Sequence, residues 1–571
     1  MTTLTQRFFT QALRYENKLC FAHRSELGWE SQTWSQVAHQ VRNAMTGLVQ
    51  AGIEPGDRIV LLAENRPEWA IFDLAIMGIG ALVVPAYVTH TERDLRHICD
   101  LVEPKGIIVS SEALTRKVML AVRESQTLKR IWSHARDAIS TERDKQPLVE
   151  NWDSLLSDQP NKHAELHPCK DSDTCCLIFT SGTSGLPKAA MLSHKSIGAN
   201  VDAAIDILSK HNFGSHDRFL SFLPLAHAYE HTAGLHMPIA LGAEIWFCES
   251  TEKLQQYLPE VCPTVATAVP RLYDMLYGRI NSQLKNASNV KQLLFTKTLE
   301  LGKKRSKGEK FSIFESLTDR GLDQLVRKKV RARFGGRIRY FISGGAALNP
   351  AVGEFFTALG VGIIQGYGQT EASPLISVNR PGKIQMDSVG QAFDGVDTKI
   401  ADDGELLVKG DLVMNGYWQD PKATDGTIID GWLHTGDLAT IDENGFIKIT
   451  GRKKDLIVTS GGDNISPSKI ESLLCSEAEI EQAVVCGDGK PWLCAVIVPT
   501  ADLAPDSQIY NVVESAIQRI NSTLAPAERI RKFIIQKDLC TTENGLLTPT
   551  QKVKRTAVIE LNGKQIERLY G

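Results

Sequence analysis

The sequence lacks the cysteine patterns of a disulfide-stabilised or zinc-binding protein. Its 11 cysteines are odd in number, and they form neither a CxxC pair nor a Cys/His cluster at zinc-ligand spacing. Cys175 and Cys176 are adjacent and lie in an apolar run. These features argue against a disulfide framework and favour buried, reduced thiols in a cytosolic protein.

An excess of charge of one sign is also missing. Lys and Arg total 64 residues, Asp and Glu total 67, and the formal net charge is −3. No overall basic field is therefore present to attract a nucleic acid, and we expect no nucleic-acid partner.

Long hydrophobic runs that mark export or a membrane span are missing as well. Residues 1–10 lack a basic stretch followed by an apolar core, so they do not resemble a secretory signal. The longest apolar stretch, Trp69–Val88, is interrupted by Asp73 and Pro85, which favours a buried helix followed by a strand. We expect a cytoplasmic location, and leave peripheral contact with the inner membrane face open.

What is present is the composition of a globular protein of several units. The chain has 571 residues, of which 42% are hydrophobic and 23% charged. At roughly 150 residues per unit this suggests about four units, which could be subdomains of two larger bodies. A helical pattern at Thr33–Ala51 and strand patterns at Asp57–Leu62 and Lys105–Ser110 predict parallel sheets covered by helices on both faces. Residues 134–172 are polar and suggest an irregular surface segment.

Three later segments differ from this alternation. Residues 281–337 are helical in pattern and strongly basic. The plain interpretation is a solvated helical face, and the alternative is attraction to an anionic partner such as an acidic lipid surface. Residues 404–450 alternate short strands with turns, which predicts antiparallel β-structure. A mixed α/β tail follows Gly451.

A loop rich in glycine and hydroxyl side chains follows an apolar strand at Thr174–Thr180. It runs from Thr180 to Lys188 with the sequence TSGTSGLPK. Two glycines allow a close backbone approach, while hydroxyls, N–H groups and the lysine charge suit phosphate oxygens. The loop differs from the common nucleotide P-loop, because Pro187 separates the glycine from Lys188. A flexible surface loop is the alternative.

Two further segments follow strand patterns and could contact a nucleotide. In Gln365–Glu371, Tyr367 offers a stacking ring, Thr370 a hydroxyl and Glu371 a hard oxygen ligand for Mg²⁺. In Ser343–Ala347, small residues would let a planar ligand lie against the backbone. Each segment, taken alone, is equally compatible with a turn.

Three more segments bring the number of candidate motifs to six. Trp432–Asp437 (WLHTGD) ends in a carboxylate that could accept hydrogen bonds from sugar hydroxyls. Gly451–Asp455 (GRKKD) suggests either a solvated linker or a hinge. Leu547–Arg555 (LTPTQKVKR) carries Lys552, and a loop lysine is most often only a surface charge.

In their order and spacing, the six motifs resemble the adenylate-forming (AMP-binding) superfamily over nearly the whole chain. The resemblance is greatest to long-chain fatty acyl-CoA synthetases, because of Phe222–Glu230 (FLPLAHAYE), Phe334–Arg337 (FGGR) and the LTPT form of the last motif. It implies an α/β fold with a large N-terminal domain, residues 1–451, that includes a small β-barrel-like subdomain. It also implies a smaller, mobile α+β lid, residues 452–571.

The resemblance also implies two half-reactions and a role for each motif. A fatty acid would be activated by ATP to acyl-AMP, and coenzyme A would then take the acyl group. Lys552 would bridge carboxylate and α-phosphate, His227 would lie at the acyl gate, Thr370 would contact the α-phosphate and Lys454 would be the hinge. Mg²⁺ is assigned to Glu371 and Thr183. The implied ATP and AMP ligands are Thr180, Ser181, Gly182, Thr183, Ser184, Gly185, Lys188, Gly345, Ala346, Ala347, Gly366, Tyr367, Asp437 and Arg452.

Two positions depart from or vary within the family pattern. Ala189 stands where the family usually has glycine after Pro-Lys, and Asp463 lies at a variable lid position, which affects the expected coenzyme A contacts. Alternative functions are an acyl-AMP ligase that loads a carrier-protein thiol, a ligase for medium-chain or aryl acids, and a non-catalytic binding protein. A homodimer is a further expectation.

Overall fold

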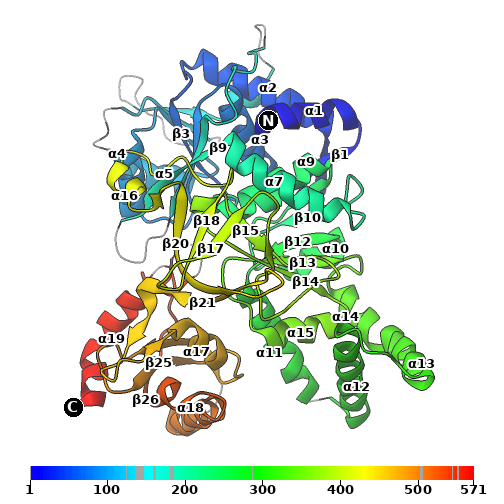
Figure 1. Ribbon diagram of the computed structural model, residues 1–571. Helices are drawn as coiled ribbons and strands as arrows, with labels where there is room; N and C mark the ends of the chain where they lie inside the picture. Colours follow the sequence, from blue (N-terminus) through cyan, green and yellow to red (C-terminus); the bar gives the residue numbers. More distant parts are fainter. Residues whose placement is uncertain are drawn as a thin grey trace.

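The computed structural model describes residues 2–123, 125, 127–134, 147–158, 163–180, 186–285, 287–501, 506–542, 544–548 and 552–571. Figure 1 shows a large body made of the first two-thirds of the chain, an antiparallel sheet in its middle, and a C-terminal unit beside a group of helices at its lower end. Among the helices of these residues, none combines the length and apolar character needed to cross a bilayer.

The first sheet supports the phosphate-loop candidate. It has seven strands in the order β7-β6-β5-β3-β4-β8-β9. These are β3 (Arg58–Leu62), β4 (Leu82–Pro85), β5 (Gly106–Val109), β6 (Arg130–Ser133), β7 (Leu148–Asn151), β8 (Thr174–Thr180) and β9 (Lys188–Ser193). All neighbours are parallel except β8 and β9, which pair antiparallel.

Helices around this sheet follow the predicted alternation. They are α2 (Trp34–Gln50), α3 (Pro67–Gly78), α4 (Glu92–Val102) and α5 (Glu112–Ala121). The interrupted apolar run at 69–88 forms most of α3 followed by β4, as the sequence predicts. The expectation of an irregular surface segment at 134–172 is wrong in part, because this segment includes β7 and the buried Trp152. Strand pairing and packing of Trp152 against Phe72 override the polar composition.

The second sheet carries most of the other motifs. Its order is β16-β15-β14-β13-β12-β10-β11-β1-β2, with parallel strands in the centre and antiparallel strands at both ends. The strands are β1 (Leu19–Ser25), β2 (Gly28–Thr33), β10 (Arg218–Ser221), β11 (Glu244–Phe247), β12 (Val265–Ala268), β13 (Tyr340–Ser343), β14 (Gly362–Gly368), β15 (Leu375–Val378) and β16 (Gln391–Ala392). Several motifs follow the carboxyl ends of these parallel strands, where ligands bind in open α/β sheets.

The predicted antiparallel region forms a five-stranded sheet. Its strands are β17 (Asp397–Ile400), β18 (Glu405–Lys409), β19 (Ile428–Ile429), β20 (Trp432–Ile441) and β21 (Ile447–Arg452). They follow the path β17-β18-β20-β19, with β21 on β20. Turns at residues 402–404 and 443–445 connect neighbouring strands, as the glycine-containing sequences predict.

The residues after Arg452 build apolar clusters of their own. β24 (Ile480–Cys486), β25 (Leu493–Pro499) and β26 (Ile530–Ile535) form a sheet. The helices α17 (Pro467–Leu474), α18 (Asp506–Asn521) and α19 (Arg555–Tyr570) pack around it. A hairpin, β22 (Ile457–Val458) with β23 (Asn464–Ile465), precedes them. The clusters contain residues from 457 to 570 and none from the body.

We predict that Gly368→Ala destabilises the protein. A Cβ atom at this position would lie 1.8 Å from the carbonyl oxygen of Pro374, which is backbone and has little freedom to move. We expect a loss of at least about 2 kcal/mol in the free energy of unfolding, measured by chemical denaturation. Gly278→Ala in α11 (Pro270–Lys285) is the control, because nothing lies within 4 Å of its added Cβ. Equal stability of the two variants would contradict the prediction.

Candidate active site

The phosphate-loop candidate is a β-hairpin whose tip, residues 181–185, lies outside the described residues, so Ser181, Gly182, Thr183, Ser184 and Gly185 remain sequence-based expectations. Thr180 ends β8 and Lys188 begins β9, and the two residues are paired across the hairpin. The Lys188 ammonium lies 5.0 Å from the centre of the Tyr417 ring. The hairpin therefore presents an exposed positive charge beside an aromatic face.

Ala189 occupies a fully buried position next to this charge. It pairs with Phe179 across the hairpin and belongs to the apolar cluster of the first sheet. The backbone carbonyl of Ala189 accepts a hydrogen bond from the backbone N–H of Trp418 at 2.8 Å. The methyl group fills core space, and alanine here is a packing feature of β9.

Glu371 and Thr370 lie in a single 3₁₀ turn, η3 (Thr370–Ala372), just beyond β14. The hydroxyl of Tyr417 donates to Glu371 Oε1 at 2.7 Å. The backbone N–H of Met414 also donates to the carbonyl of Glu371, at 2.9 Å. The Glu371 carboxylate is thus held in place through Oε1. A carboxylate is a suitable ligand for a Mg²⁺ ion that also binds substrate phosphates.

Asp437, buried in β20, is the best-connected carboxylate of the site. Tyr367 donates its hydroxyl to Asp437 Oδ2 at 2.5 Å, and Arg452 Nε lies 3.0 Å from Asp437 Oδ1. Asp437 and Arg452 face each other across β20 and β21. Burial and the Asp437 charge raise the pKa of Tyr367, so the phenol stays protonated and donates. These three side chains form one rigid corner.

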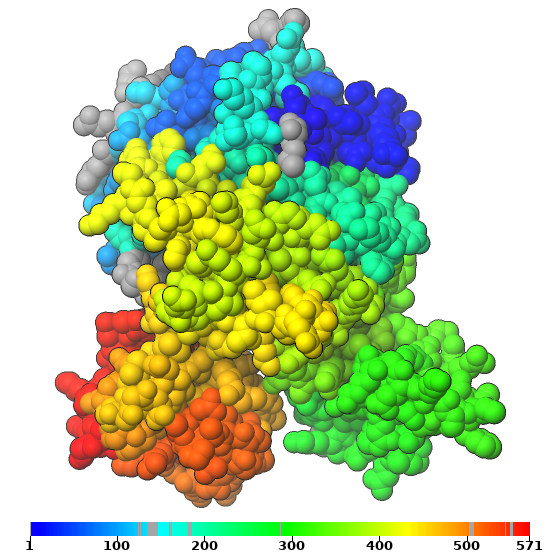
Figure 2. Space-filling model, viewed as in Figure 1, coloured from blue at the N-terminus to red at the C-terminus, as the bar shows by residue number. Residues whose placement is uncertain are grey.

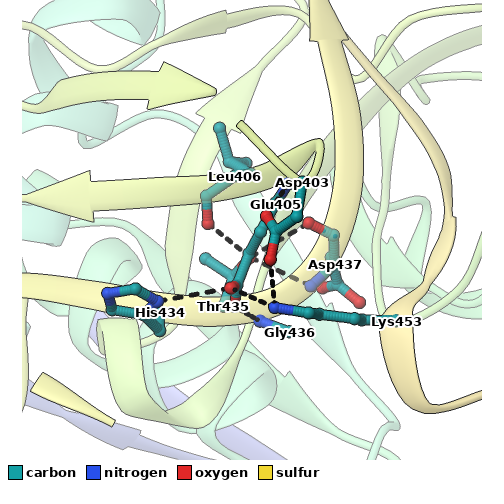
Figure 3. A network of polar contacts seen from close by, with 8 residues as sticks. All are labelled: Asp403, Glu405, Leu406, His434, Thr435, Gly436, Asp437 and Lys453. Atoms are coloured by element: carbon teal, nitrogen blue, oxygen red, sulfur yellow. Dashed lines mark hydrogen bonds and ion pairs between the residues drawn. The ribbon is translucent and has the colours of Figure 1, made fainter. Parts of the chain in front are cut away.

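A second polar network lies next to Asp437, as Figure 3 shows. Glu405 accepts from the N–H of Gly436 at 2.7 Å and from Lys453 Nζ at 3.1 Å. Lys453 also contacts Asp403. The Thr435 hydroxyl donates to the carbonyl of Leu406 at 2.7 Å. The bend at Gly436 that precedes Asp437 is thereby held to the neighbouring strand β18.

The two glycine-containing segments lie on neighbouring strands. β13 and β14 are parallel neighbours, so the loop that begins after Ser343 and the end of β14 share one sheet edge. Gly345, Ala346 and Ala347 are exposed, and Gly345 has φ +83°. The second motif lies within β14 up to Gly368, whereas the sequence suggested that it follows the strand. Antiparallel pairing with β15 extends β14 to this point.

Lys552 reaches the corner from the C-terminal unit. It keeps exposed surface, yet the surrounding protein and the charge of Arg452 lower its pKa to about 8. The half-buried His227 lies opposite: burial and, secondarily, the charge of Lys552 lower its pKa to about 4. Nδ1 of His227 accepts a hydrogen bond from the backbone N–H of Tyr229 at 3.1 Å. Lys454 lies in the turn η4 (Lys453–Asp455), directly after β21.

Sequence inspection missed three residues of this region. Tyr417 had no motif around it, and it is identified only by its contacts with Glu371 and Lys188. Tyr229 and Glu230 are in the quoted FLPLAHAYE segment, but no role was assigned to them. Tyr229 donates its hydroxyl to the carbonyl of Ile342, and the side chain of Tyr229 lies 3.1 Å from where a Cβ of Gly344 would be.

Glu230 is a fully buried carboxyl group without an ion partner among its described contacts. It accepts from the hydroxyl of Ser221 at 2.6 Å and from that of Thr267. Burial outweighs these hydrogen bonds and raises its pKa to about 7. Its hydrogen bonds join the carboxyl ends of β10 and β12 to α8 (Ala228–Glu230).

Two protein-family models and several known proteins match the chain. The family described as AMP-binding enzyme matches residues 8–418, and the AMP-binding enzyme C-terminal domain matches residues 454–571. The long-chain-fatty-acid–CoA ligase FadD15 of Mycobacterium bovis is 33% identical, with 95% of this chain and 92% of the relative covered. Human long-chain-fatty-acid–CoA ligase 6 is 30% identical, over 94% of this chain and 82% of the relative.

Solved structures share the fold at lower identity. The anthranilate CoA ligase AuaEII in complex with anthranoyl-AMP has a TM-score of 0.76 at 19% identity, covering 98% of this chain and 97% of that one. The A-PCP didomain of carboxylic acid reductase from Segniliparus rugosus, in complex with AMP, has a TM-score of 0.79 at 20% identity, covering 100% and 82%.

We predict that Glu230→Gln makes stability less dependent on pH. The folded-state pKa of about 7 exceeds the ordinary value of 4.5, so the neutral carboxyl contributes fully below pH 4.5 and this contribution is lost as pH rises through 7. Between about pH 4 and about pH 8, the free energy of unfolding of the Glu230→Gln variant should shift relative to wild type by about 3 kcal/mol in the variant's favour. Denaturation at both pH values measures this.

Glu26→Gln is the control, because Glu26 is exposed on the turn between β1 and β2 and forms no ion pair among the described residues. Its stability difference from wild type should be the same at both pH values. Identical pH dependence in Glu230→Gln and wild type would mean that Glu230 does not titrate in this range.

Proposed function

The chain belongs to the AMP-binding enzyme family, and from this premise we propose that it is a long-chain fatty acid–CoA ligase. A carboxylate oxygen of the fatty acid attacks the α-phosphorus of ATP, and pyrophosphate leaves. The thiol sulfur of coenzyme A then attacks the acyl carbon, and AMP leaves. The observation that supports the adenylation step is the electrostatic influence of Arg452 and Asp437 on Lys552, and of Lys552 on His227.

Charge repulsion is the main barrier that these residues address. Attack of one anion on another brings negative charges together, and a fixed cation in a site of low water content offsets this repulsion where charge develops. Among the described residues, Lys552 forms no ion pair with a carboxylate. The surrounding protein and the charge of Arg452 hold its pKa at about 8, against the opposing charge of Asp437. Its ammonium is therefore available to the carboxylate and the α-phosphate.

The remaining site residues fit distinct parts of ATP. We assign the hydroxyls and amides of 180–188 to the β- and γ-phosphates, with the Lys188 charge. Asp437 and Arg452 hold the ribose, Gly345, Ala346, Ala347 and Gly366 line the adenine, and Tyr367 borders it. Thr370 contacts the α-phosphate. Glu371, fixed by Tyr417, would hold Mg²⁺ together with Thr183, and the ion would neutralise phosphate charge when bound.

We further propose that the chain divides into a domain of residues 1–451 and a lid of residues 452–571 that rotates at Lys454. Lys453 Nζ is held by Asp403 and Glu405 of the body. The chain is thus anchored immediately before Lys454, and rotation beyond this anchor would withdraw Lys552 and open the acyl-adenylate to coenzyme A. A cytoplasmic location and a homodimer stay predictions from the sequence.

The function is tested by incubating the enzyme with ATP, Mg²⁺ and palmitate, with and without coenzyme A. We expect palmitoyl-CoA, AMP and pyrophosphate to form together. Acyl-AMP that accumulates and ignores coenzyme A would favour a ligase that loads a carrier protein. Turnover of benzoate or octanoate in preference to palmitate would favour the aryl or medium-chain alternative. The absence of pyrophosphate release with any acid would indicate a non-catalytic protein.

We predict that Lys552→Ala abolishes adenylation, by at least about 100-fold in kcat/KM, while thioester formation from supplied acyl-AMP is retained. The physical reason is that the Lys552 ammonium stabilises developing negative charge only in the adenylation half-reaction. Pyrophosphate release and single-turnover thioester formation measure the two steps. Lys564→Ala is the control, because Lys564 is exposed on α19. Equal loss of both half-reactions would show that Lys552 acts in both.

Lys552→Arg separates charge from position. Because the pKa of Lys552 is about 8, the ammonium is present below this pH and lost above it. The kcat/KM for adenylation, which reports the free enzyme, should therefore fall above about pH 8. The guanidinium of the Arg variant stays charged, so its profile should lack this alkaline decrease.

A further inference from the structure

A group of helices projects from the body at the end opposite the first sheet. It consists of α12 (Asn289–Ser306), α13 (Ile313–Leu322), the π-helical turn η2 (Asp323–Arg327) and α14 (Lys328–Arg333), which we call the helical arm. Figures 1 and 2 show that the arm forms a lobe separate from the C-terminal unit, with α13 at its outer end.

The root of the arm is firmly packed. The Arg327 guanidinium is buried, pairs with Asp319 at 2.8 Å and donates to the carbonyls of Ala358 and Thr298 at 2.8 and 3.1 Å. Gly302 leaves no room for a Cβ, which would lie 2.4 Å from the Ala358 carbonyl oxygen. The orientation of the outer end is therefore fixed by its attachment to α15 (Pro350–Ala358).

Three large apolar side chains are exposed at the outer end. Ile313, Phe314 and Leu317 are exposed by 80%, 83% and 61%. They lie in the first two turns of α13, where a capping box between Ser312 and Glu315 fixes the helix start. Single exposed apolar residues are common on protein surfaces. Three large apolar side chains on adjacent helical turns, at a projecting end, instead form a patch that indicates a binding surface.

Positive charge lies beside this patch. Residues 303–317 contain five lysines and arginines against two glutamates, in a chain whose overall net charge is −3. Lys303 pairs with Glu354, Lys304 with Glu315 and Arg305 with Asp319, whereas Lys307 and Lys310 are exposed and form no ion pair among the described residues. Basic residues beside exposed aliphatic and aromatic side chains are the composition of segments that lie in the interface of anionic membranes.

We propose that the outer end of the helical arm, residues 303–317, docks on an anionic lipid bilayer, with Ile313, Phe314 and Leu317 inserted among the headgroups. A stable protein dimer uses a broad face of roughly 20–30 residues on each partner, whereas this patch is a small convex end. The benefit of docking rests on the proposed function: it would bring the enzyme to the membrane in which a long-chain fatty acid is dissolved.

The test is co-sedimentation of the full chain with phosphatidylcholine vesicles, with and without phosphatidylglycerol. We expect binding to the anionic vesicles, weaker binding at high salt, and little binding to the neutral ones. The triple variant Ile313→Ser, Phe314→Ser, Leu317→Ser should lose at least about tenfold in affinity. Leu27→Ser is the control, because Leu27 is 95% exposed on the β1–β2 turn, and it should bind as wild type does.

Activity separates this proposal from the proposed function. The triple variant should turn over palmitate in vesicle-free solution as wild type does and lose rate only with vesicle-borne palmitate. Vesicle binding without any ligase activity would uphold docking and reject the function. Equal vesicle binding by the triple variant would overturn docking. Concentration-dependent association in solution that the triple variant abolishes, without vesicle binding, would instead identify a second copy as the partner.

Discussion

The ion pair between Asp437 and Arg452 is the interaction on which the rest of the site depends. It joins β20 to β21 at the last point before the chain leaves the body. One carboxylate oxygen receives Arg452 and the other receives Tyr367 from the second sheet. A single buried carboxylate thus connects the edge of the second sheet, the antiparallel sheet and the start of the C-terminal unit.

For the proposed lid, this connection would fix the point from which rotation starts. Lys453, the residue after Arg452, is tied to Asp403 and Glu405. About 100 residues later, Lys552 meets the same corner. Its pKa is lowered first by the surrounding protein, which replaces water, and second by the charge of Arg452, and Asp437 offsets these effects only in part. An anionic substrate group would relieve this cost, which is the property of a site arranged in advance for developing negative charge.

Positive charge is concentrated in two regions of the molecule, although the total charge is small. The chain as a whole is nearly neutral, with a formal net charge of −3. Positive charge is nevertheless concentrated at Lys188, Arg452 and Lys552 in the site, and at residues 303–310 on the helical arm. The first group faces the place proposed for phosphates, and the second flanks an exposed apolar patch on a lobe separate from the C-terminal unit.

The sequence by itself determined the order of strands and helices and the positions of the motifs, because both depend on local properties. Turn glycines, alternating apolar residues and the TSGTSGLPK loop act over a few neighbouring residues, so they are visible in the chain. Contacts between distant residues were not visible. Tyr417 meets Glu371 across 46 positions, and Lys552 approaches His227 only after the C-terminal unit has packed. Trp152 and the extension of β14 also depended on partners elsewhere. Tertiary structure decided these points, because burial, pKa and side-chain pairing arise from what packs around a residue and not from its neighbours in sequence.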